Sequence, residues 1–350
     1  MIDDAAGLVA LLGEFSGDRI CAVDTEADSL HRYKESLCLI QFAVPSRSVL
    51  IDPLAIPDLH GLAEYLDDRT VWMHGADYDM TMLRREFGKI PGKVYDTQIG
   101  ARLLGLRQFG LANLVEHYFG VVLSKSSQKA DWGKRPLSEK MVEYALNDVR
   151  YLLPMAAMIE EQLTTAGRLD WFVESCESAR SKVLERDEDK EDPWRIQGSG
   201  RLDRRGLHFL KNLWEWRDEE AKRWDRPSFM VATNRQLLEW SGSLATGQRI
   251  EWPSHFRPDR RRRLSLSLEA CQKTDADQYP EKVRGKRLRR DKDFDRRVDD
   301  LIARRNRVAE ELGLEGSVIA PRAALEAIAG ADDGHEESLM QWQRVVLGME

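Results

Sequence analysis

Cysteine is scarce in this chain of 350 residues, and its four cysteines are widely scattered. No two of them form a CxxC pair, which argues against a disulfide framework and against a zinc site. No apolar run approaches the roughly 18–20 residues needed to cross a bilayer. The chain starts MIDDAAGLVALLGEF, with acidic side chains where a signal peptide needs basic ones. These absences predict a soluble, cytoplasmic protein without a membrane partner.

Charge is unevenly distributed along the chain, whose net charge is −7. Residues 201–310 hold 28 Lys and Arg against 19 Asp and Glu, a local balance of +9, so the remainder of the chain carries −16. A basic segment joined to an acidic one is typical of proteins in which one part binds a polyanion and another binds metal ions. Well-solvated Arg-rich helices would give the same balance, and charge alone does not separate the two interpretations.

The order of apolar patterns predicts an α/β domain in the first half of the chain. Four short runs rich in β-branched residues indicate strands of a buried sheet, at 20–24, 37–44, 48–52 and 70–74. Helical spacing follows at 77–88, and the longest predicted helix covers 138–162, with Ser138 as N-cap and a kink at Pro154. We therefore expect helices packed on a mixed sheet.

A change of composition marks the end of this domain. Residues 185–200 are dominated by charge and contain a proline, so we interpret them as a linker. Beyond them only helical patterns occur, interrupted by basic clusters at 257–263 and 282–290. The predicted boundaries are 1–184 for the α/β domain, 185–200 for the linker, and 201–280 and 281–350 for two helical domains.

Two acidic motifs follow apolar strands. In AVDTEADS, Asp24 and Glu26 are two apart, so their side chains point to the same side of a strand end. Carboxylates placed in this way suit a hard cation such as Mg²⁺, although a short DxE motif is also common in ordinary turns. In VWMHGADYDMTML, Asp77 and Asp79 stand near a helix start, where Asp is often only a cap.

A third motif lies within the long predicted helix. Tyr144 and Asp148 are four residues apart in EYALNDVRYLL, so they share one helical face. A phenol beside a metal-binding carboxylate is a reasonable pairing for orienting a nucleophilic water. Taken alone, a tyrosine on an apolar helix is more often a core residue whose hydroxyl reaches the rim.

Taken in order, these motifs resemble the DEDD exonuclease superfamily in its tyrosine form, and more narrowly the ribonuclease D family. The resemblance covers most of residues 18–160: DTEADSLHRYKESLCLIQFA, HGADYDMTMLRREFG, YDTQIGARLLG, and the stretch SSQKADWGKRPLSEKMVEYALNDVRYL. In the second motif the metal-binding Asp lies five residues after the His, which selects Asp79 rather than Asp77. The histidine form would need His at position 143, where this chain has Glu143.

The resemblance implies a ribonuclease H-like fold and a site for two divalent metal ions, Mg²⁺ or Mn²⁺. Asp24, Glu26, Asp79 and Asp148 would bind the metals, and Tyr144 would position the nucleophilic water. Four carboxylates are the number needed for a pair of metal ions about 3.5–4 Å apart. Other side chains of these motifs would support the site or position the substrate: His74, Asp96, Gln128, Trp132 and Arg135.

The segment WEWRDEEAKRWDRPSFMVATNRQLLEWS (214–241) resembles the HRDC domain, and a weaker second copy is predicted at 298–348. Residues 251–273 depart from that domain's pattern, which puts the later helices of the first copy in doubt. The resemblance implies binding of single-stranded nucleic acid, in which Lys and Arg neutralise phosphates. The candidates for backbone contact are Arg261, Arg262, Arg263, Lys286, Arg287, Arg289 and Arg290.

The function predicted from the resemblance is 3′→5′ exonucleolytic trimming of RNA 3′ ends, with tRNA precursors as substrates and nucleoside 5′-monophosphates as products. Two alternatives stay open at this point. The same chemistry on DNA is one, since no residue pattern here reads a 2′-hydroxyl. A non-catalytic nucleic-acid-binding scaffold is the other, and the presence of all four carboxylates argues against it. We expect a monomer without an obligate protein partner.

Overall fold

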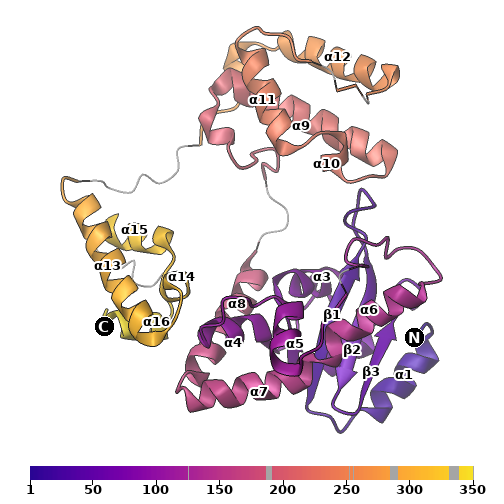
Figure 1. Cartoon of the computed structure of the whole chain (residues 1–350). Helices are drawn as coiled ribbons and strands as arrows, with labels where there is room; N and C mark the ends of the chain where they lie inside the picture. Colours follow the sequence, from indigo (N-terminus) through magenta and orange to yellow (C-terminus); the bar gives the residue numbers. More distant parts are fainter. Residues whose placement is uncertain are drawn as a thin grey trace. The chain divides into compact units, whose positions relative to one another are not determined.

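The computed structural model describes residues 1–124, 126–186, 191–251, 253–254, 256–283, 291–330 and 339–349. These residues divide into two compact units. Unit 1 comprises Met1–Ala27, Leu37–Arg186 and Leu288–Glu350, and unit 2 comprises Asp28–Ser36 and Asp187–Arg287. Figure 1 shows the strands gathered in the N-terminal part of unit 1 and helices alone elsewhere. None of the helices that the structure describes is long and apolar enough to cross a membrane.

Unit 1 is built on a five-stranded sheet in the order β3-β2-β1-β4-β5. The strands are β1 (Ile20–Ala27), β2 (Leu37–Val44), β3 (Arg47–Ile51), β4 (Thr70–Met73) and β5 (Lys93–Asp96). β2 pairs antiparallel with β1 and with β3, whereas β4 pairs parallel with β1 and β5. The predicted mixed sheet is confirmed, and β5 is a short strand that the sequence patterns did not indicate.

Helices cover both faces of this sheet because its strands alternate between two buried faces. On one face α1 (Ala5–Glu14), α2 (His60–Asp67) and α3 (Asp77–Phe87) pack on side chains such as Val23 and Phe42. The opposite face, with Ala22 and Trp72, packs against helices later in the chain. These are α4 (Thr97–Leu103), α5 (Leu111–Phe119), α6 (Glu139–Arg150), α7 (Leu152–Thr165) and α8 (Leu169–Glu185).

The single kinked helix predicted over 138–162 is wrong, because the chain forms two helices that meet at Tyr151. Ser138 caps α6 as predicted, and its side chain accepts a hydrogen bond from the Met141 N–H. Pro154 lies in the first turn of α7, where a missing N–H costs no helical hydrogen bond, so it does not kink a continuous helix. The separate α6 carries both Tyr144 and Asp148.

The remaining helices form two groups, one in unit 2 and one in the C-terminal segment of unit 1. Unit 2 contains α9 (Arg204–Trp224), α10 (Ser228–Val231), α11 (Asn234–Ala245) and α12 (Pro258–Gln272) around a shared apolar core. The helix that the sequence left in doubt, over 251–273, is α12. In unit 1, α13 (Phe294–Leu312), α14 (Gly316–Ile319), α15 (Arg322–Gly330) and α16 (Gln341–Leu347) follow. The indole of Trp342 in α16 stacks on Trp171 of α8, with ring centroids 4.9 Å apart.

Candidate active site

Three carboxylates from two distant segments converge on one point of unit 1. Asp24 and Glu26 project from the same side of β1, as the period of a strand requires. Asp148 comes from α6, which packs across β1 and β2. One ligand oxygen from each of the three lies within 4.8 Å of the others. The structure thus brings together the first and third predicted motifs.

Asp79 of α3 is held beside this group by Thr25, the residue between the two β1 carboxylates. It is buried in the first turn of α3, and its Oδ1 accepts a hydrogen bond from the Thr25 hydroxyl at 2.6 Å and another from the Thr25 N–H at 3.0 Å. Asp77, by contrast, is exposed and pairs with Arg186 at 2.6 Å. The geometry therefore separates the two aspartates, with Asp79 directed to β1 and Asp77 to the surface.

Burial raises the pKa of all four carboxyl groups, and repulsion within the cluster raises it further for Asp24, Glu26 and Asp148. Burial, followed by the charges of Asp79, Asp148 and Glu26, raises the pKa of Asp24 well above its usual range. For Glu26, burial and the charges of Asp148 and Asp79 raise the pKa to about 9. Burial and Asp79 raise the pKa of Asp148 to about 7. For Asp79, burial raises the pKa only to about 6, because the hydrogen bonds from Thr25 oppose it.

Such a cluster fits divalent cations. None of the four carboxylates forms an ion pair with a lysine, arginine or histidine among the described residues, so their charges are not balanced by the protein there. Buried charges are stable only when they are paired or coordinate metals. Oxygen ligands are those that Mg²⁺ and Mn²⁺ prefer. The two hydrogen bonds to Asp79 both fall on Oδ1 and leave Oδ2 available as a ligand.

Tyr144 lies one helical turn before Asp148 and shares its face of α6. Burial, then the charges of Asp148, Glu26 and Asp24, raises the pKa of its phenol, so the hydroxyl keeps its proton at neutral pH. The ring packs against Trp132, with centroids 6.0 Å apart. Tyr144 is therefore held as a neutral hydrogen-bonding group beside the carboxylates.

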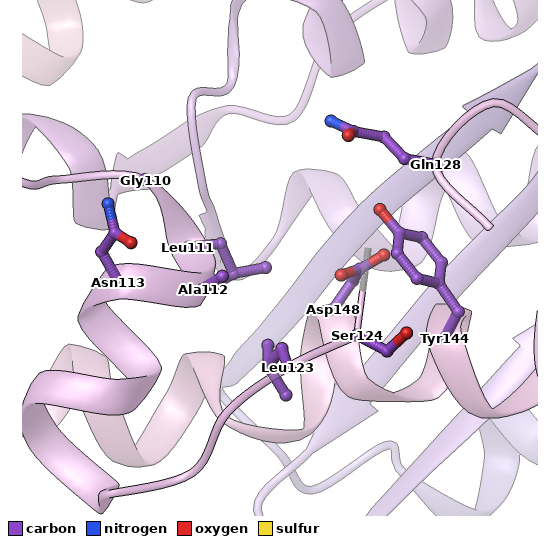
Figure 2. A pocket seen from close by; sticks show the side chains of 9 residues that line it. All are labelled: Gly110, Leu111, Ala112, Asn113, Leu123, Ser124, Gln128, Tyr144 and Asp148. Carbon is purple, nitrogen blue, oxygen red and sulfur yellow. The ribbon is translucent and has the colours of Figure 1, made fainter. Parts of the chain in front are cut away.

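A pocket of about 220 Å³ opens beside Tyr144 and Asp148 (Figure 2). Its opposite wall is the start of α5, where Gly110 is the N-cap and supplies no side-chain capping hydrogen bond. The first N–H groups of a helix lack partners within it and carry partial positive charge, which suits an anion. Besides Tyr144 and Asp148, the residues that line the pocket are Gly110, Leu111, Ala112, Asn113, Leu123, Ser124 and Gln128. Of these the sequence had singled out only Gln128, although a glycine before a helix start is a readable signal.

His74 and Asp96 organise the turn that leads into α3. Both oxygens of the Asp96 carboxylate accept hydrogen bonds from the N–H groups of Gly75 and Ala76, each at 2.9 Å. Nδ1 of His74 lies 2.9 Å from the Thr97 hydroxyl, and burial lowers the pKa of this histidine. These contacts fix the backbone from which Asp79 projects. They are consistent with the supporting role expected for both residues.

Arg135 and Trp132 anchor the segment in front of α6. The guanidinium of Arg135 forms a bidentate pair with the buried Asp52, at 2.6 and 2.7 Å, and donates to the Cys38 and Trp132 carbonyls. Trp132 is almost completely buried against Tyr144. Both side chains are thus engaged within the protein. These contacts indicate that Arg135 and Trp132 hold α6 and Tyr144 in place. The pairing of Arg135 with Asp52 was not predicted from the sequence.

Gln41 is a further residue of this site that the sequence reading did not assign. It is fully buried on β2 directly opposite Asp24, and neither its Oε1 nor its Nε2 has a hydrogen-bond partner in the part of the chain that the structure describes. An unsatisfied buried amide is costly, so it needs a reason beyond packing. The Leu-Ile-Gln of the first motif was the available signal.

The basic residues proposed for backbone contact fall into two groups. Arg261, Arg262 and Arg263 lie in the first turns of α12, where Arg262 is exposed and Arg263 pairs with Glu220 and Asp259. Lys286, Arg287, Arg289 and Arg290 lie outside the described residues. Of the three arginines that the structure describes, only Arg262 has an exposed side chain.

Sequence comparisons match the chain to two families. Residues 1–164 match a family of 3′-5′ exonucleases, and residues 207–244 match the HRDC domain. The chain is 36% identical to ribonuclease D of Cronobacter turicensis over 244 residues, which cover 68% of this chain and 65% of the relative, a little under two thirds of its length. It is 30% identical to ribonuclease D of Xanthomonas oryzae pv. oryzae over 333 residues, covering 93% of this chain and 90% of that one.

The folds agree over a longer stretch. The crystal structure of Escherichia coli RNase D, described as an exoribonuclease involved in structured RNA processing, superposes with a TM-score of 0.75 at 26% identity. That superposition covers 99% of this chain and 96% of the other. The exonuclease match contains all four carboxylates and Tyr144, and the HRDC match lies within unit 2. On the evidence of the near full-length relative, the chain belongs to the ribonuclease D family.

Proposed function

We propose that this protein is a metal-dependent 3′→5′ exoribonuclease that releases nucleoside 5′-monophosphates from RNA 3′ ends. The observation that carries this proposal is the convergence of Asp24, Glu26 and Asp148, with Asp79 alongside, at the mouth of a pocket that Tyr144 also lines. Membership of the ribonuclease D family supports the choice of RNA.

The four carboxylates would hold two divalent ions, Mg²⁺ or Mn²⁺. When bound, such ions supply Lewis-acid stabilisation of the phosphodiester oxygens and make water a stronger nucleophile at neutral pH. The protein's own contribution is geometric. β1 supplies two carboxylates at fixed spacing, α6 supplies Asp148, and Thr25 fixes the orientation of Asp79.

Tyr144 would orient the attacking water through its hydroxyl. Because the phenol keeps its proton, the oxygen can accept a hydrogen bond from water while its own proton is donated to a nearby acceptor. Asp148, one turn further along α6, faces the same pocket (Figure 2). The pair would therefore align the nucleophile without either side chain becoming covalently attached to the substrate.

The pocket beside this pair would receive the 3′-terminal nucleotide. The start of α5 would face the phosphate, and the side chains of Asn113, Ser124 and Gln128 would offer hydrogen bonds to the sugar or base. We propose single-stranded 3′ ends as the substrate, with tRNA precursors as the physiological RNA and the cytoplasm as the location.

The test is trimming of a 5′-labelled single-stranded RNA with Mg²⁺ or Mn²⁺, and then with EDTA. We expect stepwise shortening from the 3′ end that stops with EDTA. Asp79→Asn should abolish shortening, whereas Asp77→Asn, two residues away on the surface, should leave it unchanged. Equal loss in both variants, or shortening that persists in EDTA, would reject the metal assignment. The same assay on DNA of matched sequence separates the RNA from the DNA alternative.

A further inference from the structure

A cavity of about 500 Å³ in unit 2 is lined by four arginines, two carboxylates and an exposed tryptophan. It is formed where the end of α9 meets the start of α12, and its lining residues are Glu220, Arg223, Trp224, Arg257, Asp259, Arg260 and Arg263. The four guanidinium groups and two carboxylates leave a net charge of +2 on its walls. This excess is local, whereas the chain as a whole is acidic.

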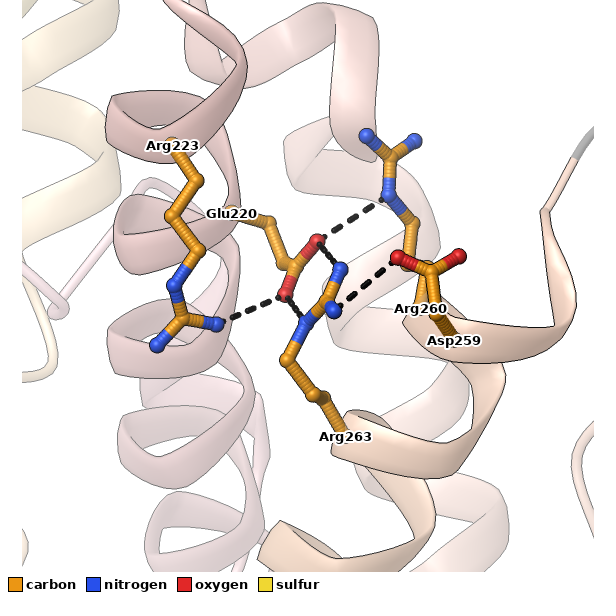
Figure 3. A network of polar contacts seen from close by, with 5 residues as sticks. All are labelled: Glu220, Arg223, Asp259, Arg260 and Arg263. Atoms are coloured by element: carbon orange, nitrogen blue, oxygen red, sulfur yellow. Dashed lines mark hydrogen bonds and ion pairs between the residues drawn. The ribbon is translucent and has the colours of Figure 1, made fainter.

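The Glu220 carboxylate lies between three of the arginines and holds them together (Figure 3). It is 1% exposed and accepts hydrogen bonds from three guanidinium groups, those of Arg223, Arg260 and Arg263. All three side-chain nitrogens of Arg263 are engaged, because Nε and Nη2 donate to the two oxygens of Glu220 and Nη1 donates to Asp259. A carboxylate accepts about four hydrogen bonds, so Glu220 is saturated.

The other arginines keep donors to spare. Arg260 reaches Glu220 through Nε alone, and Arg223 reaches it through Nη1 alone. Since a guanidinium has five N–H donors, most of theirs remain for a ligand. Arg257 is exposed and forms no ion pair with any residue that the structure describes. If neutralising Glu220 were the purpose of the cluster, Arg263 with one further arginine would suffice.

Trp224 adds an aromatic face to this cavity. Its side chain is 47% exposed, and the guanidinium carbon of Arg260 lies 4.9 Å from its ring centroid. Aromatic side chains beside cationic grooves are the usual platform for unpaired bases. An acidic peptide could pair with the arginines, but it would need an aromatic residue at one particular place to stack on the indole, whereas every nucleotide carries a base beside its phosphate. The combination therefore favours a nucleic acid over a protein partner.

We propose that Arg223, Arg257 and Arg260 bind a backbone phosphate of single-stranded RNA while Trp224 stacks on an adjacent base. The choice of RNA rests on the proposed function, but the site is separate from the carboxylate cluster and needs no metal. Of the predicted contacts on α12, Arg263 then serves to hold the site together rather than to touch the ligand.

The experiment measures binding of a fluorescent single-stranded oligouridylate to the full chain in EDTA, by anisotropy at several salt concentrations. Arg223→Ala and Arg257→Ala should each weaken binding and reduce the slope of log affinity against log salt, and the double variant should reduce it by up to about 0.7, the value for one lost phosphate contact on a single strand. Trp224→Ala should weaken binding about 5- to 100-fold and leave that slope unchanged. Trp224→Phe should restore most of the loss.

Arg235→Ala is the matched control. It removes one charge from an exposed arginine of α11 that does not line the cavity, so affinity and slope should stay near the wild-type values. The proposal is overturned if Arg257→Ala and Arg223→Ala behave like this control, or if Trp224→Ala has no effect. Competition by polyglutamate as strong as that by RNA would point to an acidic protein instead. Trimming with Mg²⁺ is scored separately, so a failure of catalysis and a failure of this site give different results.

Discussion

The hydrogen bond from Thr25 to Asp79 allows a quantitative test of how the site is tuned. Replacing Thr25 by Val keeps the shape of the side chain but removes the hydroxyl that donates to Asp79 Oδ1 at 2.6 Å. Both residues are buried, so water is not at hand to replace the lost donor. The backbone N–H of residue 25 still donates at 3.0 Å. The substitution therefore removes one of two hydrogen bonds to the same oxygen.

The magnitude follows from the strength of a hydrogen bond to a charged group, about 1.5–3 kcal/mol. Since about 1.36 kcal/mol corresponds to one pH unit, the pKa of the Asp79 carboxyl should rise by about one to two units. Its pKa in the wild type is raised by burial to about 6 and is held there by Thr25. The wild-type carboxylate is mostly ionised at pH 7. In Thr25→Val the protonated form of Asp79 should be as abundant as the ionised form at pH 7, or more abundant, and protons then compete with the metal for this carboxylate.

The measurement is Mn²⁺ affinity by calorimetry, together with the trimming rate, from pH 6 to pH 9. Thr25→Val should bind Mn²⁺ about twofold to tenfold more weakly near pH 7, because protons then occupy about half to nine-tenths of the Asp79 carboxyl groups, and the deficit should shrink as the pH rises. Thr25→Ser keeps the hydroxyl and serves as the control. If the pH profile of Thr25→Val matches the wild type, or if Thr25→Ser is equally defective, the hydrogen bond does not set the charge of Asp79.

Three further predictions concern stability. Arg135→Met leaves the buried Asp52 unpaired and should lower the free energy of unfolding by about 3–5 kcal/mol in urea titrations, and a loss below about 1 kcal/mol would contradict a buried bidentate pair. Gln41→Leu removes two unsatisfied polar atoms and should stabilise the metal-free protein by about 1–3 kcal/mol while weakening Mn²⁺ binding; destabilisation in EDTA would show that the amide has a partner. In EDTA, the raised pKa of Asp148 means that the folded state binds more protons than the unfolded one, so its stabilising effect is complete below about pH 4 and is lost as pH rises to about 7. The melting temperature of Asp148→Asn in EDTA should therefore fall less steeply with rising pH over this range than that of the wild type. Parallel curves of melting temperature against pH would show that the pKa of Asp148 is not raised in the folded state.

Strands and motifs were predictable where burial imposes a strong local pattern. β1 and β2 are buried on both faces, so each contains a nearly continuous apolar run, and the run of β1 stops at the acidic motif that begins with Asp24. The choice of Asp79 over Asp77 came from the spacing to His74, and the structure places Asp79 against Thr25 and Asp77 at the surface. β5 escaped prediction because Lys93–Asp96 has a charged residue at each end and only two central residues that pack in the sheet, which is too little pattern to mark a strand without its partner β4.

The contacts between distant segments could not be read from local patterns. The break between α6 and α7 falls at Tyr151, within a stretch whose helical spacing continues on both sides. The pairing of Arg135 with Asp52 spans 83 residues, and neither residue signals the other. The cavity in unit 2 depends on Glu220 of α9 meeting Arg260 and Arg263 of α12, so a run of arginines in the sequence became a mixture of ion-paired and available side chains.

The sequence by itself determined which residues are the candidates for the chemistry, because Asp24, Glu26, Asp79, Tyr144 and Asp148 occur in motifs whose order and spacing resemble those of the ribonuclease D family. Only the tertiary structure decided the protonation, the charge partners and the surroundings of these side chains. Their convergence in a buried place raises the pKa of the carboxyl groups, leaves them without cationic partners among the described residues, and sets Tyr144 beside a pocket formed by the start of α5. The physical reason is that desolvation and charge–charge repulsion depend on distances between elements, and these distances arise only when β1, α3, α5 and α6 pack together.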